Sequence, residues 1–186
     1  MTPLCLPLSR KDFYIFDDLE GFTPHLSRLV FMLEYVRFNT LEAVKALTID
    51  QLDAQVFPEG NTIGLLLAHI AGIERSYQAV TFWGEHLPAN LPEFALGEVG
   101  RTHFQGFPLD FYLERLASTR AETLEQLRRR DDAWLHHSYQ PWGRNDWNNY
   151  FCWFHVAEDE LRHQGQIVML VKEIKRRGAE RAHPVQ

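Results

Sequence analysis

The sequence predicts an all-α protein built as a four-helix bundle with a long crossover between helices two and three. Apolar residues recur at helical spacing over four long stretches, and segments with the alternation of a β-strand are nearly absent. A stretch without periodicity separates the second and third helical stretches. The 186 residues suit one domain, with residues 1–20 as an N-terminal tail and residues 178–186 as a frayed C-terminus.

The first helix is predicted to begin at Thr23-Pro24, because proline is favoured in the first turn of a helix. Its apolar positions recur at roughly helical spacing: Leu26, Leu29, Val30, Leu33, Val36, Val44 and Leu47. A turn around residues 58–60, Pro-Glu-Gly, separates it from the next helix.

The second helix can be capped by Asn61 or Thr62 and extends to about Trp83. Its apolar face carries Leu65, Leu66, Ile73 and Tyr77, and His69 lies among them. An imidazole on an apolar face is either a core histidine bonded to a backbone carbonyl or a ligand.

Residues 84–107 contain two prolines and lack periodicity, so we expect a long surface crossover, a kind of segment that often carries function. The third helix is predicted from Pro108 to about Arg129, with Leu113, Leu116 and Leu127 facing inward. Residues 131–144 are expected to form an irregular connector. Its His136-His137 pair is left out of any site because adjacent residues do not face each other on a helix.

The fourth helix is predicted to start from caps at Asn145-Asp146 and to end before Gly178, reaching about Arg177. An apolar stripe runs along it through Cys152, Val156, Ile167, Leu170 and Ile174. Asp159 and His163 fall on the same face as this stripe. Burying an unpartnered carboxylate costs several kcal/mol, so a metal ion, an ion pair or a hydrogen-bonded network must accompany it.

Composition excludes several classes of protein. A formal charge of −6 argues against a nucleic-acid or anionic-membrane partner. The two basic runs, at residues 128–130 and 175–177, lie at predicted helix ends, where cations favour the helix dipole. No stretch resembles a signal peptide or a transmembrane helix, and Cys5 and Cys152 are too few for a disulfide framework, so a cytoplasmic location is expected.

The second and fourth predicted helices together could supply the ligands of a metal centre. Residues at i and i+4 lie about 5–6 Å apart at Cβ, close enough for Asp159 and His163 to hold one cation. Within a bundle, His69 could complete a set of two histidines and one carboxylate. Three protein ligands leave coordination positions open, as catalytic metal sites do. The alternative is that His69 bonds a backbone carbonyl while Asp159 pairs with His163 or Arg162.

Three segments carry a resemblance to a known family: GFTP and SRL at residues 21–24 and 27–29, EGNTIGLLLAHI at 59–70, and WFHVAEDELRHQGQI at 153–167. Over nearly its whole length the chain resembles the DinB/YfiT-like superfamily of metalloenzymes, in a bacterial branch catalogued as a domain of unknown function. The resemblance implies an up-down-down-up bundle. It also implies one divalent metal ion held by His69, Asp159 and His163.

The chain departs from the superfamily at Asp159, where the commonest pattern has histidine and mycothiol-dependent isomerases have glutamate. A carboxylate shifts the preference towards Fe²⁺ or Mn²⁺ without excluding Zn²⁺ or Ni²⁺. Members of known activity are S-transferases or isomerases that use bacillithiol, mycothiol or glutathione. The resemblance therefore implies a low-molecular-weight thiol as cosubstrate.

Neighbouring side chains are candidates for supporting roles. His155, one turn before Asp159, is a candidate general base or partner of a metal ligand, although capping or a surface position fits equally well. Glu160 could pair with a ligand's ring nitrogen, but an ordinary ion pair or a solvated carboxylate is the favoured interpretation. Six aromatic residues either wall a substrate pocket or, as packing statistics favour, fill the core: Tyr77, Trp83, Trp142, Trp147, Tyr150 and Trp153. Cys152 is expected to be a buried, inert thiol.

The leading hypothesis is a metal-dependent transferase that joins a low-molecular-weight thiol to a small electrophilic substrate. The alternatives are a metal-dependent hydrolase and a non-catalytic metal-binding helical bundle linked to stress response. Flat apolar helix faces make a homodimer reasonable.

Overall fold

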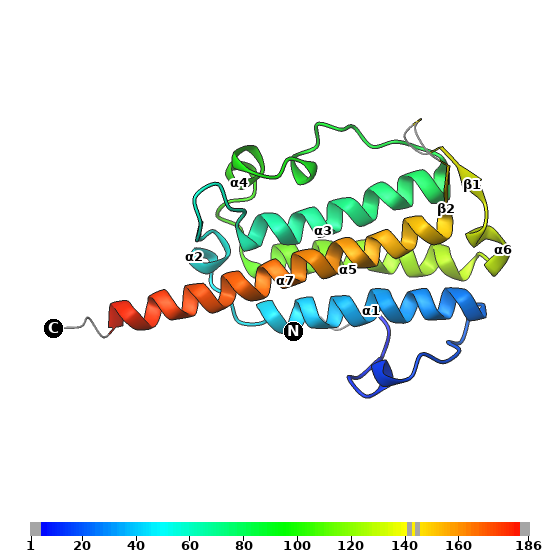
Figure 1. The fold of residues 1–186 in the computed structure, drawn as a ribbon, viewed down its shortest axis with the longest axis horizontal. Coiled ribbons are helices and arrows are strands. Elements are labelled where there is room, and N and C mark those ends of the chain that lie inside the picture. Colours follow the sequence, from blue (N-terminus) through cyan, green and yellow to red (C-terminus); the bar gives the residue numbers. More distant parts are fainter. Residues whose placement is uncertain (1–4, 141–142, 144–145, 183–186) are drawn as a thin grey trace.

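Four long helices lie side by side in the computed structural model, which describes residues 5–140, 143 and 146–182 (Figure 1). They are α1 (Pro24–Val44), α3 (Ile63–Gln78), α5 (Leu109–Arg128) and α7 (Asn149–Ala182). Helix α3 packs against both α5 and α7, and α1 packs against α7. The predicted, mostly helical class is confirmed.

Short elements connect the long helices. They are η1 (Asp12–Tyr14), α2 (Ile49–Leu52), η2 (Ala79–Trp83), η3 (Pro92–Phe94), α4 (Glu98–His103), α6 (Asp132–Leu135), β1 (Ser138–Tyr139) and β2 (Trp147–Asn148). The second helix starts as predicted, because the Thr62 hydroxyl accepts a hydrogen bond from the Leu65 amide over 3.3 Å. Its predicted last turn is the π-helical turn η2.

The connector before α7 is more regular than predicted. The side chain of Asp131 caps α6 by accepting from the Trp134 amide over 3.0 Å. Strands β1 and β2 then pair antiparallel, with Tyr139 opposite Trp147. Two-residue strands are too short to show alternation in the sequence, so no pattern could indicate them.

Both predicted ends of the fourth helix are wrong. Of the predicted caps, Asn145 lies outside the described residues, and Asp146 precedes β2. The cap is Asn148, whose Oδ1 accepts from the Phe151 amide over 2.9 Å. Gly178 does not end α7, because Arg176 pairs with Glu173 and Glu180 and so bridges the glycine. Residues 178–182 are therefore helical rather than frayed.

The described part of the N-terminal tail is anchored. Phe13 is buried, with its ring 5.7 Å from Tyr35 and 5.6 Å from Phe38 of α1. The Leu6 amide donates to Glu34 Oε2 over 3.4 Å. The N-terminal tail is thus attached to α1 through Leu6 and Phe13, while most of the residues between and after them are exposed.

A buried charged network links the four long helices between two apolar clusters. Arg37 Nε donates to Glu160 Oε1 over 2.8 Å. Arg120 donates through Nε to Glu74 Oε1 over 2.7 Å and through Nη1 to Glu34 Oε1 over 2.9 Å. On each long helix these residues lie between the members of the two apolar clusters. We call these five residues the Arg120 network.

Glu160 forms ion pairs, as the favoured interpretation allowed, but they are buried: its side chain is 1% exposed and belongs to the Arg120 network, so it is not a solvated carboxylate. Its buried ion pairs restrict the rotation of α7 about its axis. That restriction fixes the directions of its neighbours Asp159 and His163. Among the described residues, no helix is long and apolar enough to cross a bilayer.

Candidate metal centre

Helices α3 and α7 bring His69, Asp159 and His163 together. Each residue offers one ligand atom, and these three atoms lie within 4.8 Å of one another. The imidazole centroids of His69 and His163 are 4.9 Å apart with nearly perpendicular planes. His163 Nε2 lies 3.6 Å from Asp159 Oδ1. Both histidines are buried and the aspartate is nearly so.

Hydrogen bonds orient the two imidazoles. His69 Nδ1 lies 2.7 Å from the backbone carbonyl oxygen of Glu93, and His163 Nδ1 lies 3.1 Å from Gln166 Oε1. A carbonyl oxygen can only accept, so Nδ1 of His69 carries the hydrogen and its Nε2 is the nitrogen available to a metal. The contact with Gln166 orients the His163 ring so that its Nε2 faces Asp159.

Asp159 provides the test of fit for a cation. Its Oδ2 is buried and has no hydrogen-bond partner among the described residues. An unpartnered buried carboxylate oxygen beside two imidazole lone pairs is costly unless a positive charge compensates it. The contacts of the alternative interpretation are both present, since His69 bonds a carbonyl and His163 Nε2 lies 3.6 Å from Asp159 Oδ1. They leave this oxygen unexplained, and two imidazoles with one carboxylate suit a divalent transition metal.

Burial is the largest influence on the pKa of His69 and lowers it, and the neighbouring His163 lowers it further. The hydrogen bond to the Glu93 carbonyl and the charge of Asp159 act in the opposite direction and raise the pKa in part. The net direction is downward. The ring is therefore neutral at neutral pH and free to act as a ligand.

The crossover segment holds His69 in place. A Cβ atom at Gly72 would lie 2.5 Å from Glu93 Cγ and 2.7 Å from Glu93 Cβ, so the glycine allows η3 to approach α3 closely. Arg75 Nη1 pairs with Glu93 Oε1 over 3.0 Å, and Arg115 lies 3.9 Å from the same atom. These contacts aim the Glu93 carbonyl at the ring of His69.

Sequence reasoning missed Glu93, Gly72 and Gln166. A backbone carbonyl leaves no mark on residue type, and the crossover lacks the periodicity that would place it against α3. Only the three-residue spacing of Gln166 after His163 on one helix could have indicated a contact.

His155 lies one turn before Asp159 on α7. Its Nδ1 is 3.2 Å from Glu158 Oε2, without hydrogen-bond geometry. Its ring packs edge-on against Tyr77 at 5.7 Å between centroids. Burial, followed by the charges of Cys152 and Asp159, raises the pKa of Tyr77, so its hydroxyl stays protonated.

Other candidate residues stay outside the centre. Trp153 is fully buried and stacks on Phe82 at 5.0 Å, so it fills the core. Trp142 lies outside the described residues. Burial raises the pKa of the Cys152 thiol, whose sulfur lies 3.5 Å from the Tyr139 hydroxyl, and this agrees with an inert thiol. His136 and His137 do not join the three ligand-type residues.

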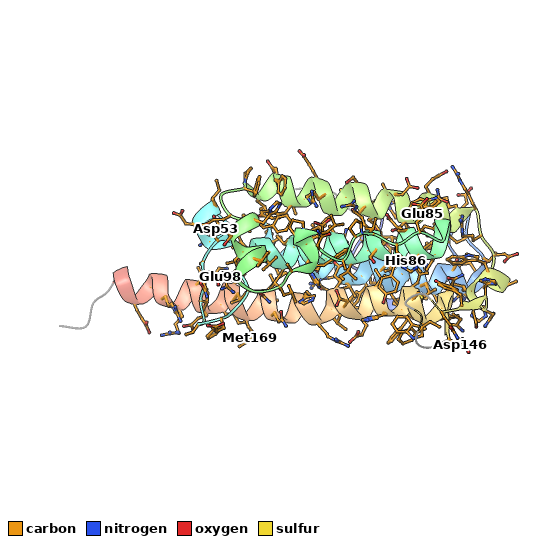
Figure 2. The ribbon with its side chains drawn as sticks, turned by 90° about the horizontal axis from the view of Figure 1, so that it is seen from above. Asp53, Glu85, His86, Glu98, Asp146 and Met169 are labelled. Atoms are coloured by element: carbon orange, nitrogen blue, oxygen red, sulfur yellow. The ribbon has the colours of Figure 1, made fainter. Side chains whose placement is uncertain are left out.

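A cavity of about 620 Å³ opens onto His69 and is called here the His86 cavity. Its polar groups come from Ser76, His86 and Gln140, and Phe94 adds an apolar wall. Figure 2 labels His86 on the crossover segment that follows η2. The cavity gives a small molecule access to one of the three ligand-type residues.

Comparison with known families gives one relevant match. A family model described as Mycothiol-S-transferase matches residues 28–175, a range that includes His69, Asp159 and His163. No curated protein matches the chain.

Proposed function

The chain belongs to the Mycothiol-S-transferase family, and from this premise we propose that it is a metal-dependent enzyme that transfers a low-molecular-weight thiol to a small electrophilic substrate. The grouping of His69, Asp159 and His163 carries the proposal. Mycothiol is the first thiol to test, with bacillithiol and glutathione as comparisons.

We propose His69 Nε2, His163 Nε2 and a carboxylate oxygen of Asp159 as the metal ligands. Three protein ligands leave positions for a substrate, and this donor set accepts Zn²⁺, Fe²⁺, Mn²⁺ or Ni²⁺. The Glu93 carbonyl and Gln166 support the site because they orient the two rings.

A bound divalent cation lowers the pKa of a coordinated thiol and so supplies a thiolate at neutral pH. We propose that His155 accepts the thiol proton or holds Asp159 in position. Its place one turn before Asp159 on α7, with its ring against Tyr77, supports the assignment.

We also infer that residues 1–186 form one domain and that the four long helices make an up-down-down-up bundle. The contacts of α3 with α5 and α7, and of α1 with α7, support this topology, as does the course of the helices in Figure 1. A cytoplasmic location and a homodimer stay predictions.

Metal content tests the site first. Protein purified without an affinity tag is analysed by plasma mass spectrometry, as wild type and as the His69→Ala/His163→Ala double variant. We expect about one metal ion per chain in the wild type and almost none in the variant. His103→Ala, at an exposed histidine, is the matched control and should keep its metal. Stoichiometric metal in the double variant would refute the assigned ligands.

Activity tests the reaction. Wild-type protein, mycothiol and 1-chloro-2,4-dinitrobenzene are combined, and formation of the thioether is followed by absorbance. Transfer that requires both thiol and metal supports the proposal. Consumption of the electrophile in buffer without thiol would instead favour the hydrolase, and bound metal without turnover would favour a non-catalytic bundle.

A further inference from the structure

A second cavity, of about 470 Å³, is lined by Gln166, the hydrogen-bond partner of the candidate ligand His163. It lies between α3, α7 and the loop that precedes α3, and is called here the Met169 cavity. Leu66 of α3 lines it, whereas the His86 cavity is lined by His69, Ile73 and Ser76, so the two cavities follow one another along α3. Figure 2 shows Met169 and His86 at well-separated places along the molecule.

The Met169 cavity approaches the centre from both helices. Leu66 precedes His69 by three residues on α3, and Gln166 follows His163 by three residues on α7, so each is about one 5.4 Å turn away. The Oε1 atom of Gln166 also lies 3.1 Å from His163 Nδ1. A molecule seated in this cavity can therefore extend one end towards the metal ligands.

The walls of the Met169 cavity are mainly apolar. The apolar side chains are those of Phe57, Leu66, Met169 and Leu170. Two of them are exposed: Phe57 by 49% and Met169 by 61%. Large apolar side chains exposed around a cavity indicate a surface that a ligand can cover. The lining includes Glu59 and no basic side chain, so it disfavours an anion.

The backbone at the mouth of the cavity is strained. Glu59 has φ of +61°, a left-handed conformation that is uncommon for a residue other than glycine. Arg101 Nη1 donates to the carbonyl oxygens of Glu59 and Gly60, over 3.4 and 3.0 Å. The loop is thus held in place beside the cavity, which is therefore preformed.

The two cavities differ in the ligand that each suits. The His86 cavity carries the hydroxyl of Ser76, the imidazole of His86 and the amide of Gln140. These groups can bond a hydrophilic thiol whose sulfur reaches the metal. The Met169 cavity is smaller, and its lining carries neither an imidazole nor a basic side chain, so it suits an uncharged aromatic or branched alkyl group.

We propose that the Met169 cavity binds the apolar body of the electrophile, while the His86 cavity receives the thiol. This inference rests on the proposed function and specifies how its two substrates share one centre. In the transfer, the thiolate sulfur forms a bond to the electrophilic carbon, the bond from that carbon to its leaving group breaks, and the leaving group departs with the electron pair. The thiol proton passes to the base.

Gly165→Leu tests the assignment. Gly165 lines the Met169 cavity, and a Cβ there would meet no atom within 4 Å, so leucine can fill the cavity without a clash. We expect the KM for 1-chloro-2,4-dinitrobenzene to rise about tenfold, as loss of a few apolar contacts does. The KM for the thiol and the metal content should change by less than about twofold, within the ordinary effect of a surface substitution.

Gly178→Leu is the matched control. Gly178 lies on the same helix, its Cβ position is equally open, and it lines neither cavity. Both variants replace a helical glycine by leucine, so an effect specific to Gly165→Leu reports on the cavity. A rise in the thiol KM in Gly165→Leu, or an unchanged electrophile KM, would overturn the assignment.

A binding measurement separates this inference from the proposed function. The uncharged fluorophore N-phenyl-1-naphthylamine should bind wild type, Gly178→Leu and the metal-free His69→Ala/His163→Ala variant, and should bind Gly165→Leu about tenfold more weakly. Equal binding to both leucine variants would refute an apolar site. If Gly165→Leu alone lost fluorophore binding and the wild type showed no transferase activity, the apolar site would stand and only the proposed function would be refuted.

Discussion

His69 Nδ1 donates a hydrogen bond to the backbone carbonyl oxygen of Glu93 over 2.7 Å, which ties the crossover to the metal centre. The residues are 24 positions apart, and Gly72 allows their segments to meet. The contact directs Nε2 of His69 towards Asp159 and His163. The crossover therefore acts as a support for a ligand rather than as a passive connection.

Gly72→Ala should weaken metal binding by roughly 10- to 100-fold, the usual effect of removing a hydrogen-bonding partner of a metal ligand. The added Cβ would displace the Glu93 side chain and with it the carbonyl that orients His69. Competition with a chromogenic chelator measures the affinity. Gly178→Ala serves as the control for a helical glycine away from the site, and an unchanged affinity in Gly72→Ala would show that the crossover does not position His69.

Asp159→Asn should affect the free energy of unfolding differently in the metal-free and the metal-bound protein. In the metal-free state the substitution removes a buried charge with one unpartnered oxygen, so the free energy of unfolding should stay equal or rise. With metal at 100 times its Kd, wild type should gain about 2.7 kcal/mol, and the variant should gain far less. Urea unfolding with and without a chelator measures both, and an equal gain would exclude Asp159 as a ligand.

Arg120→Met should lower the free energy of unfolding by about 3–5 kcal/mol, because it leaves the buried carboxylate of Glu34 without a cation and leaves Glu74 and Glu160 with Arg37 alone. Arg120 is fully buried and pairs with Glu34, Glu74 and Glu160. Arg129→Met removes an exposed pair and should cost less than about 0.5 kcal/mol. Urea denaturation compares the two, and similar losses would show that the Arg120 network contributes little.

Acid should destabilise the protein partly through Glu74. Burial by itself raises the pKa of this carboxyl, but Arg120 and Arg37 outweigh burial and hold the pKa below its ordinary value. The pKa of Glu74 is lower in the folded protein than in the unfolded chain, where it is about 4.3. The stability that ionised Glu74 contributes is therefore complete above the unfolded pKa and is lost as the pH falls through the folded pKa. Glu74→Gln should be less stable at pH 7 and lose less stability below about pH 4. Urea unfolding between pH 7 and pH 3 measures the difference, and parallel curves would contradict it.

The positions of the long helices and the set of ligand-type residues could be predicted from sequence because both depend on local spacing. Helical periodicity located α1, α3 and α5 to within a few residues. The four-residue interval between Asp159 and His163 placed both on one face of a helix, as observed. The motif around His69 then indicated the partner helix.

Local spacing failed where a contact joins distant residues or where a helix boundary depends on side-chain pairs. Gly178 was predicted to stop α7, but the helix continues to Ala182, and the ion pair between Arg176 and Glu180 spans the glycine. Glu160 was expected to form an ordinary ion pair or to be solvated. The burial of its ion pairs depends on Arg37 and Arg120, which come from two other helices.

The sequence by itself determined a mostly helical chain and the three candidate ligands, since these follow from which side chains share a helix face. Only the tertiary structure decided that the Glu93 carbonyl orients His69, that a charged network fixes α7, and that one cavity is lined by His69 and another by Gln166, the partner of His163. The physical reason is that periodicity describes each helix alone. Carbonyl contacts, buried ion pairs and cavities arise only when separate segments pack against one another.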